Sequence, residues 1–242
     1  MQKSLISCAL LWCCFAATAS GTEPLKACFI SGSAEYDSDA SLDSFKEHVE
    51  KHFPVEVTLL KARGFDELSG LEALDDCDVA LFFTRRLTID GEALELVKKY
   101  CEAKKPIVAV RTASHGFQNW LEFDKLVLGG NYQGHFGEGP TLIAKVEPGA
   151  EKHPALKGVA AKIESKYSLY RTAPLASDAT VLMTGETADS GGPQPVTWIR
   201  EQDGGRVFYT SLGGTKDFEN PDFLRILVNA LFWTANRDPS SK

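Results

Sequence analysis

Short apolar runs alternate with amphipathic segments over the first half of this 242-residue chain, and this alternation limits most what the chain can fold into. Four runs have the length and the composition of buried strands, at residues 25–30, 55–60, 79–83 and 107–110. Between them, residues 38–53 and 90–103 place apolar side chains at helical spacing. This order favours an α/β fold with a doubly wound, mostly parallel sheet and helices on both faces. Such sheets bind ligands beyond the carboxyl ends of their strands.

The second half of the chain predicts further strands, joined by polar turns. Apolar runs recur at residues 141–146, 180–184, 196–200 and 207–211. Asp203-Gly204 is a typical hairpin-turn pair, and Asn220 followed by Pro221 is typical of the start of a helix. Because no linker-like segment divides the chain, we expect a single domain over residues 20–242.

The N-terminus has the pattern of a secretory signal peptide. Lys3 precedes an apolar stretch, and Ala17-Thr18-Ala19 offers small residues where a signal peptidase cuts. We therefore expect residues 1–19 to be removed and the remaining chain to be exported, to the periplasm or the extracellular space. After cleavage we expect no integral membrane segment. We interpret the remaining cysteines as small buried hydrophobic residues: Cys28, Cys77 and Cys101.

The charge of the chain argues against nucleic acid as a partner. The formal net charge is −7 at pH 7, and no dense Lys/Arg cluster is present. Phosphate backbones are bound by concentrated basic surfaces, so this balance favours a small molecule that is neutral or weakly charged.

A polar junction follows the strand-like run at residues 107–110. The chain continues as Arg111-Thr112-Ala113-Ser114-His115, and α/β proteins often place reactive groups at such junctions. Arg111 could hold a carboxylate, a phosphate or a sugar hydroxyl, or it could be buried in an ion pair that fixes the turn. Ser114 and His115 are sequence neighbours whose side chains point in different directions in most conformations, so a serine–histidine dyad is not favoured.

Two histidines, His115 and His135, are candidates for chemistry. His135 lies in a glycine-rich segment, GGNYQGHFGEG, whose backbone can approach a ligand closely. If both side chains reach one cleft they could bind a divalent metal, with Glu138 or Asp124 as a third ligand. The sequence has no HxH or HExxH spacing at these positions, so the alternative that each histidine hydrogen-bonds to a loop carbonyl stays open.

Several motifs together resemble one known family. PIVAVRTASHGF, LGGNYQGHFGEGP and the C-terminal block from PVTWIREQDGGRVFYT to NALFWTAN match, in order and spacing, the ThuA-like (trehalose utilisation) family. The similarity runs from about residue 26 to residue 236. It implies a flavodoxin-like fold of the class I glutamine-amidotransferase-like superfamily, in agreement with the alternation of strands and helices.

The resemblance also shows what this chain lacks. In amidotransferases of that superfamily the junction after the fourth strand carries a nucleophilic cysteine, and Arg111 takes its place here. A guanidinium has no lone pair to act as a nucleophile, so amidotransfer at this position is excluded. Many ThuA-like proteins have histidine at this position and Asp-Glu-x-Tyr where this chain has Ser168-Leu169-Tyr170. The chain instead resembles a secreted subgroup with Arg-Thr-Ala-Ser-His at the junction.

These observations lead to one main expectation and one alternative. The resemblance implies an exported carbohydrate-associated enzyme that acts on a small sugar or keto-sugar by histidine acid/base chemistry, which a divalent metal could assist. The expected catalytic residues are His115, His135 and Arg111, with the two histidines also as metal ligands. The expected substrate-binding residues are Arg85, Asn131, Tyr132, Tyr170 and Arg171. The alternative is a non-catalytic sugar-binding or interaction module on the same fold. No nucleotide cofactor is expected, because residues 211–218 have neither the GxGxxG nor the Walker pattern.

Overall fold

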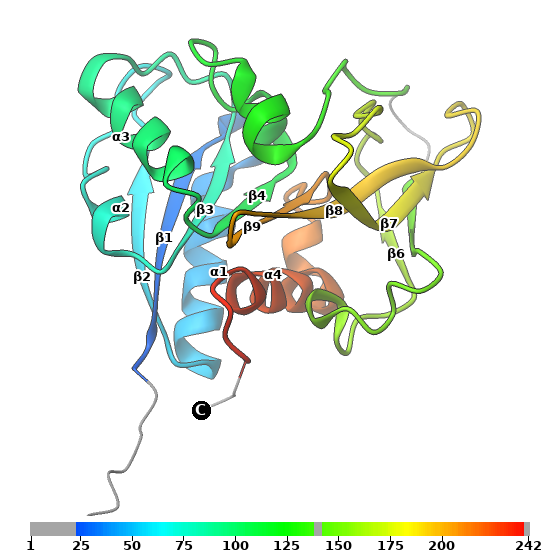
Figure 1. Ribbon diagram of the computed structural model, residues 1–242. Coiled ribbons are helices and arrows are strands. Elements are labelled where there is room, and N and C mark those ends of the chain that lie inside the picture. The colour runs from blue at the N-terminus through cyan, green and yellow to red at the C-terminus, as the bar shows by residue number, and fades with distance from the viewer. Residues whose placement is uncertain (1–22, 138–141, 240–242) are drawn as a thin grey trace, which may run out of the picture.

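The computed structural model describes residues 23–137 and 142–239, and one nine-stranded sheet runs through them (Figure 1). The strands are ordered β2-β1-β3-β4-β9-β8-β7-β5-β6. The expected signal peptide, residues 1–19, and Glu138 lie outside the described residues.

One half of the sheet is parallel. It consists of β1 (Leu25–Gly32), β2 (Val55–Lys61), β3 (Val79–Thr84), β4 (Ile107–Val110) and β9 (Gly205–Thr210). These strands coincide with predicted apolar runs. β3 and β4 are buried at every position because they lie in the middle of the sheet with both faces covered, which explains why their sequences are continuously apolar.

The other half is an antiparallel extension. It consists of β5 (Leu142–Val146), β6 (Lys162–Ser165), β7 (Ala179–Glu186) and β8 (Gln194–Gln202). The sheet as a whole is therefore mixed, and the α/β class is confirmed. The edge strand β6 is missing from the sequence prediction because Ile163 is its only apolar residue.

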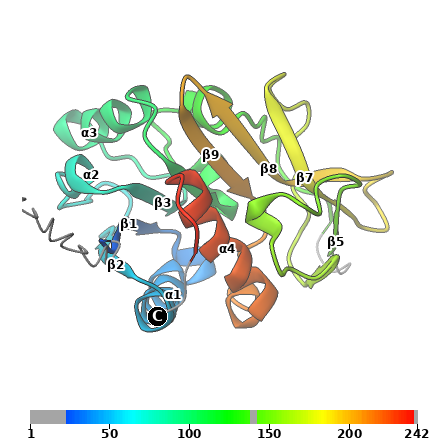
Figure 2. The same ribbon diagram turned by 60° about the horizontal axis from the view of Figure 1, so that its bottom comes forward.

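Helices cover both faces of the parallel half. α1 (Ser38–His52) and α4 (Pro221–Thr234) pack on one face, and α2 (Ala73–Asp76) and α3 (Gly91–Glu102) pack on the other (Figures 1 and 2). Each pair closes a separate hydrophobic core, built for example around Phe45 on the first face and Val97 on the second. The two predicted helices that end at residues 53 and 103 are thus confirmed.

Five short helices connect these elements. They are the 3-10 helices η1 (Ala34–Tyr36), η2 (Arg111–His115), η4 (Pro154–Leu156) and η5 (Asp217–Glu219), and the π-helix η3 (Phe123–Leu128). The junction predicted after β4 is η2, and η3 precedes the glycine-rich loop that carries His135.

Two local predictions from turn and cap residues are confirmed. Asp203 and Gly204 have φ values of 49° and 86°, the left-handed conformation that a two-residue hairpin turn requires, and they join β8 to β9. The side chain of Asn220 caps α4, because its Oδ1 accepts a hydrogen bond from the amide of Asp222 at 2.9 Å.

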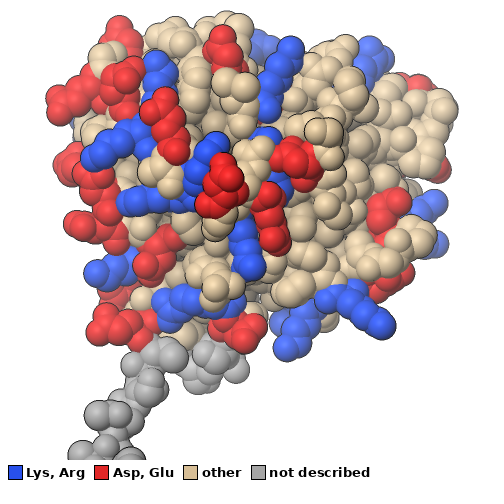
Figure 3. All heavy atoms as spheres, viewed as in Figure 1, with Lys and Arg blue, Asp and Glu red and all other residues tan. Residues whose placement is uncertain are grey.

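The surface and the thiols also agree with the sequence. On the face drawn in Figure 3, Lys and Arg side chains are interspersed with Asp and Glu rather than gathered into a basic field. Cys28 and Cys101 are buried and Cys77 is half-buried, all as free thiols. Within residues 23–137 and 142–239, no helix has the length and the apolar character needed to cross a membrane.

Candidate functional site

The segments that follow β1, β3 and β4 meet at the carboxyl edge of the sheet. The amide of Arg86, just after β3, donates to the carbonyl of His115 in η2 at 2.8 Å. The hydroxyl of Thr112 in η2 donates to Ser33, just after β1, at 2.9 Å. These bonds tie three separate strand ends together at the edge where parallel sheets bind ligands.

Arg111 occupies a sharp turn directly after β4. Its φ is 46°, in the left-handed region, which costs a residue with a side chain on the order of 1–3 kcal/mol. The neighbouring strand β9 helps to hold this turn, because Tyr209 Oη donates to the Arg111 carbonyl at 2.7 Å. The backbone of this turn is therefore held in a fixed conformation at some cost in the stability of the fold.

The Arg111 side chain is fully buried inside a cage of three tyrosines. Its Cζ lies 4.4 Å from the ring centre of Tyr36, 4.8 Å from that of Tyr170 and 5.2 Å from that of Tyr167. Aromatic faces stabilise a guanidinium that has left water. The three tyrosine rings therefore offset part of the desolvation free energy of the buried guanidinium.

Neutral oxygens supply the hydrogen bonds of this guanidinium. Nη1 donates to the Ser211 carbonyl at 2.8 Å, and Nη2 donates to Tyr36 Oη at 3.1 Å and Ser168 Oγ at 3.4 Å. Nε is buried without a partner, and among the residues that the structure describes no carboxylate lies within ion-pair distance of Arg111. The acid-paired arginine considered from the sequence is therefore not what the structure contains.

A hollow of about 680 Å³ opens beside η2. Three segments line it: the turn after β3, the stretch from η2 to η3, and the glycine-rich loop. Its polar side chains include Arg86, Ser114, His115, Asp124, Asn131 and Tyr132. This is the largest hollow found at the carboxyl edge of the described sheet, so we take it as the candidate binding site.

His115 is the central titratable group of this hollow. Its ring stacks on Tyr132 with 4.2 Å between ring centres and an interplanar angle of 16°, and its Nδ1 lies 3.2 Å from Ser114 Oγ. The half-buried ring also contacts Tyr170, whose centre is 5.9 Å away. Packing on two tyrosines fixes the plane of the imidazole.

Burial and positive charge keep His115 neutral. Desolvation is the main cause, followed by Arg85, Arg86, Arg111 and His135, and together they lower its pKa to about 3. At neutral pH the ring therefore carries one N–H donor and one free lone pair, and it can hydrogen-bond or accept a proton without first losing one.

Of the expected substrate-binding residues, Asn131 and Tyr132 line the hollow with His115. Tyr170 is buried behind them, 4.9 Å from the Tyr132 ring centre, where it contacts both Arg111 and His115. Arg85 lines a neighbouring hollow of about 360 Å³, and its Nε lies 2.5 Å from Glu35.

Arg171 and His135 lie outside the lining of the main hollow. The guanidinium of Arg171 covers the Phe136 ring at 4.6 Å. His135 is exposed, with Nδ1 2.7 Å from the Phe136 carbonyl, and its backbone pairs with Tyr170 in an isolated bridge. This is the loop-carbonyl contact that the sequence left open for a histidine.

The described residues do not fit a metal centre. In residues 23–137 and 142–239, no three His, Cys, Asp or Glu side chains gather in a way that could hold an ion. Asp124, one of the two third ligands considered with His115 and His135, instead accepts a hydrogen bond from the Tyr132 amide at 2.7 Å. We derive no chemistry through a metal at this site.

Three residues of the site have roles that the sequence did not predict, since it offered Asp124 only as a metal ligand and assigned no role to Arg86 or Tyr36. Asp124 anchors the glycine-rich loop from within η3, where burial raises the pKa of its carboxyl to about 6. Arg86 and Tyr36 follow β3 and β1 at the carboxyl edge, so their place in the chain was a usable signal. The π-helix that points Asp124 inward has no comparable signal in the sequence.

The backbone amides of the loop at residues 211–218 hold a carboxylate of the same loop. The amides of Gly213 and Gly214 donate to Asp217 Oδ2 at 2.8 and 2.9 Å, and Ser165 Oγ donates to the same oxygen at 3.1 Å. The ring of Tyr167 lies so close to Gly214 that no larger residue would fit, which places this loop against the arginine cage.

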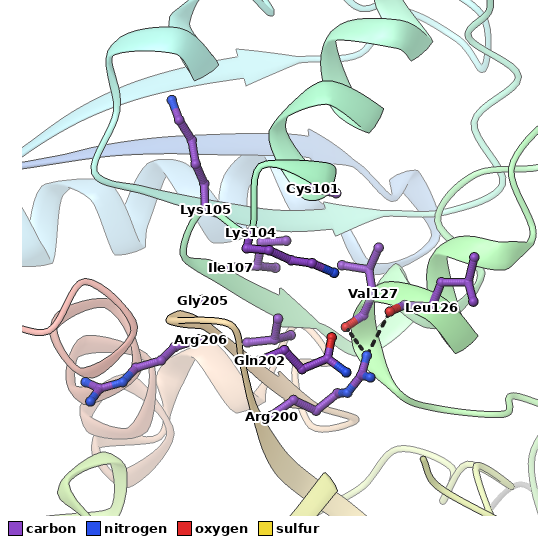
Figure 4. Close-up of a pocket in the computed structure, with 11 residues that line it drawn as sticks. Cys101, Lys104, Lys105, Ile107, Leu126, Val127, Arg200, Gln202, Gly205 and Arg206 are labelled. Atoms are coloured by element: carbon purple, nitrogen blue, oxygen red, sulfur yellow. Dashed lines mark hydrogen bonds between the residues drawn. The ribbon is translucent and has the colours of Figure 1, made fainter. Parts of the chain in front are cut away.

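A separate small hollow of about 30 Å³ lies at the opposite ends of β4 and β9 (Figure 4). Arg200 dominates it and is fully engaged, because it pairs with Asp178 at 3.0 Å and donates to the carbonyls of Leu126 and Val127, each at 2.8 Å. Arg200 thereby ties η3 to β8, and we interpret this hollow as structural.

The chain was compared with known families and proteins. Residues 26–234 match a family model described as "ThuA: Trehalose utilisation". No curated protein matches the sequence.

Solved structures share the fold at low sequence identity. A ThuA-like protein from Bacteroides uniformis ATCC 8492 is 18% identical with a TM-score of 0.69, covering 92% of this chain and 96% of that one. A ThuA-like protein from Parabacteroides merdae ATCC 43184 is also 18% identical, with a TM-score of 0.71 and coverages of 90% and 92%. Agd3, a carbohydrate deacetylase, is 10% identical with a TM-score of 0.55, over 86% of this chain and 32% of that chain. At these identities the likeness concerns the fold alone.

Proposed function

This chain belongs to the ThuA family, and we propose that it is a carbohydrate-associated enzyme acting on a small sugar or keto-sugar at the hollow beside η2. The observation that carries the proposal is His115, a neutral imidazole held on Tyr132 in the largest hollow at the carboxyl edge of the described sheet. A neutral, oriented imidazole is suited to proton transfer or to polarising a carbonyl oxygen.

One ring nitrogen of His115 already has a partner. Nδ1 lies 3.2 Å from Ser114 Oγ, in a contact where either atom can be the donor. Nε2 is the ring nitrogen that this contact leaves available, so we assign contact with the sugar and proton transfer to Nε2 of His115.

The other expected residues differ in this proposal in whether they contact the sugar. Asn131 and Tyr132 line the hollow and contact the sugar, while Tyr170 supports the stacked rings from behind. Arg111 is sealed inside its cage and acts as a positioning residue through the turn that carries His115, rather than by touching the substrate. His135 and Arg171 shape the outer part of the loop.

The alternative function is a non-catalytic sugar-binding module on the same fold. It is favoured by the depressed pKa of His115, because a strongly weakened base transfers protons less well near neutral pH. Under this alternative the hollow binds the sugar and His115 only hydrogen-bonds to it.

One comparison separates the two functions. His115→Ala is compared with wild type and with His52→Ala, which removes an exposed histidine at the end of α1. Sugar affinity is measured by calorimetry and turnover by NMR of a sugar and keto-sugar panel. The enzyme predicts turnover in wild type and His52→Ala that is lost in His115→Ala with the fold retained. Binding with no turnover in any of the three proteins would establish the module instead.

Three further parts of the proposal concern the chain rather than the hollow. The parallel half, with helices on both faces, supports a flavodoxin-like, doubly wound fold of the class I glutamine-amidotransferase-like kind. The N-terminal pattern supports a signal peptide over residues 1–19 and export of a single domain. The mass of the protein recovered from a secreting host tests the cleavage site after Ala19.

A further inference from the structure

We propose that the hollow beside η2 takes a sugar that carries an anionic group, a carboxylate or a phosphate, rather than a neutral sugar. This inference rests on the proposed function, since it assumes that the hollow binds a sugar. It concerns the charge of the ligand, which neither the family nor the similar structures specify.

The side chains that line the hollow are unbalanced in charge. Arg86 and Lys125 are cations on its wall, and both are exposed. The one acid among the lining residues is Asp124, which is only 6% exposed. Its Oδ2 accepts the Tyr132 amide at 2.7 Å and its charge interacts with Lys125, so Arg86 is the lining cation that it leaves unopposed.

Arg86 is held in place without an acidic partner. Its φ is 51°, and its amide donates to the His115 carbonyl, while the next amide, of Leu87, donates to the Gly116 carbonyl, both at 2.8 Å. Across the part of the chain that the structure describes, no carboxylate lies within ion-pair distance of Arg86. A fixed backbone and a free planar fork suit bidentate binding of a carboxylate or a phosphate.

Two further arginines add to the positive field. Arg111 lies behind His115, fully buried, with a charge that no carboxylate of the described chain pairs with directly. Arg85 precedes Arg86, although Glu35 offsets its charge at 2.5 Å. Buried and half-buried charges are weakly screened, so their field reaches the hollow more strongly than that of surface charges.

His115, itself a lining residue, lies within this positive field. After desolvation, the next contributions to its lowered pKa come from Arg85, Arg86 and Arg111. The overall charge of the chain is −7, so a local excess of cations around one hollow runs against the composition. Such an excess raises the local concentration of anions and favours their binding.

The test measures affinities of the full-length mature chain for matched sugars by calorimetry at fixed ionic strength. The probes are glucose, glucuronate and glucose 6-phosphate, and galactose, galacturonate and galactose 1-phosphate. We expect at least one anionic member to bind about tenfold or more tightly than its neutral partner, as for a charge-assisted bidentate contact. The order within a set distinguishes a carboxylate from a phosphate ligand.

Two variants locate the preference. Arg86→Gln is expected to remove most of the preference for the anion, so that the anionic and the neutral member of a set bind with similar affinity. Arg63→Gln changes an arginine that is 83% exposed and pairs with Glu67, and it should leave both affinities unchanged. NMR titration of His115 gives a second readout, because a bound anion should raise its pKa in wild type and less so in Arg86→Gln.

The outcomes distinguish the two proposals. If a neutral sugar binds as tightly as both anionic members of its set, the charge inference is overturned and the proposed sugar site stands. If none of the six sugars and no keto-sugar of the panel above binds, the proposed function fails and this inference fails with it. If the anion preference survives Arg86→Gln unchanged, the anion is held elsewhere and the hollow is not its site.

Discussion

Replacing His115 with glutamine should remove a large part of the acid sensitivity of the fold. The folded pKa of His115 is about 3, against about 6.5 for an unperturbed histidine. Between these values the unfolded state binds a proton that the folded state refuses, so the free energy of unfolding must fall as the pH falls through this window. The stability that this residue contributes is fully present above pH 6.5 and is lost on acidification.

The magnitude follows from the two pKa values. Between pH 7 and pH 5 the unfolded imidazole becomes almost fully protonated while the folded one stays neutral, and the difference amounts to about 2 kcal/mol. Urea unfolding at both pH values measures it, because about 2 kcal/mol corresponds to a midpoint shift on the order of 1 M. His115→Gln should lose about 2 kcal/mol less than wild type over this interval.

The control for this experiment is Arg63→Gln, which changes an arginine that is 83% exposed and that keeps its charge between pH 5 and pH 7, so its pH dependence should match wild type. Asp124 acts with the opposite sign, but it is present in all three proteins and cancels in the comparison. Equal losses of stability in wild type and His115→Gln would refute the argument that burial and the surrounding arginines keep His115 neutral.

Three other predictions follow from the same geometry. Asp124→Asn should abolish a stabilisation of about 1 kcal/mol that wild type gains between pH 7 and pH 5, since the raised pKa lets the folded state bind a proton first; urea unfolding checks this, and a gain retained in the variant would contradict it. Arg111→Ala should destabilise the fold by about 2–4 kcal/mol, because it empties the tyrosine cage and strips Ser211 of its donor. An Arg111→Ala melting temperature equal to that of wild type would show that the cage is not structural. Elemental analysis of the mature protein, purified without chelators, should find divalent metal well below one equivalent and unchanged in His115→Ala; a stoichiometric metal lost in that variant would reverse this expectation.

The sequence predicted the elements well where burial has a periodic or continuous signature. β3 and β4 are buried on both faces, so their runs are apolar throughout, and α1 shows its stripe because Leu42, Phe45 and Val49 pack on one side. β6 has one buried apolar residue and an exposed partner on each side of it, which is too little pattern to distinguish it from a loop. An element could be predicted when enough of its residues were apolar to form a pattern, whether it was a helix or a strand.

The site was predicted less completely, because it depends on which way side chains turn. Placing Arg111 and His115 at the end of β4 required only the strand and its polar continuation. That Arg111 turns into a cage with Tyr36, 75 residues away, while His115 lines the hollow, depends on contacts between distant segments. Asn131 reaches the hollow and His135 does not, although both lie in the same loop, because Asp124 anchors the loop at Tyr132.

The depressed pKa of His115 and the proposed anionic ligand explain each other. Without a ligand, burial and then the surrounding arginines make His115 too weak a base for efficient proton transfer near neutral pH. An anion bound beside Arg86 would cancel part of that field, so the pKa of His115 would rise when the substrate binds and not before.

Thermodynamic linkage requires the reverse as well. The protein with His115 protonated must bind the anion more tightly, by the factor that corresponds to the pKa shift. The affinity for an anionic sugar should therefore increase more steeply at lower pH in wild type than in His115→Gln, where only the Asp124 carboxyl, with its pKa raised to about 6, still titrates among the residues that line the hollow. An enzyme built this way has its proton-transfer group become basic only in the presence of its substrate, whereas a binding module gains nothing from the coupling. An affinity with the same pH dependence in wild type and in His115→Gln would break the link between the two proposals, even if each of them held separately.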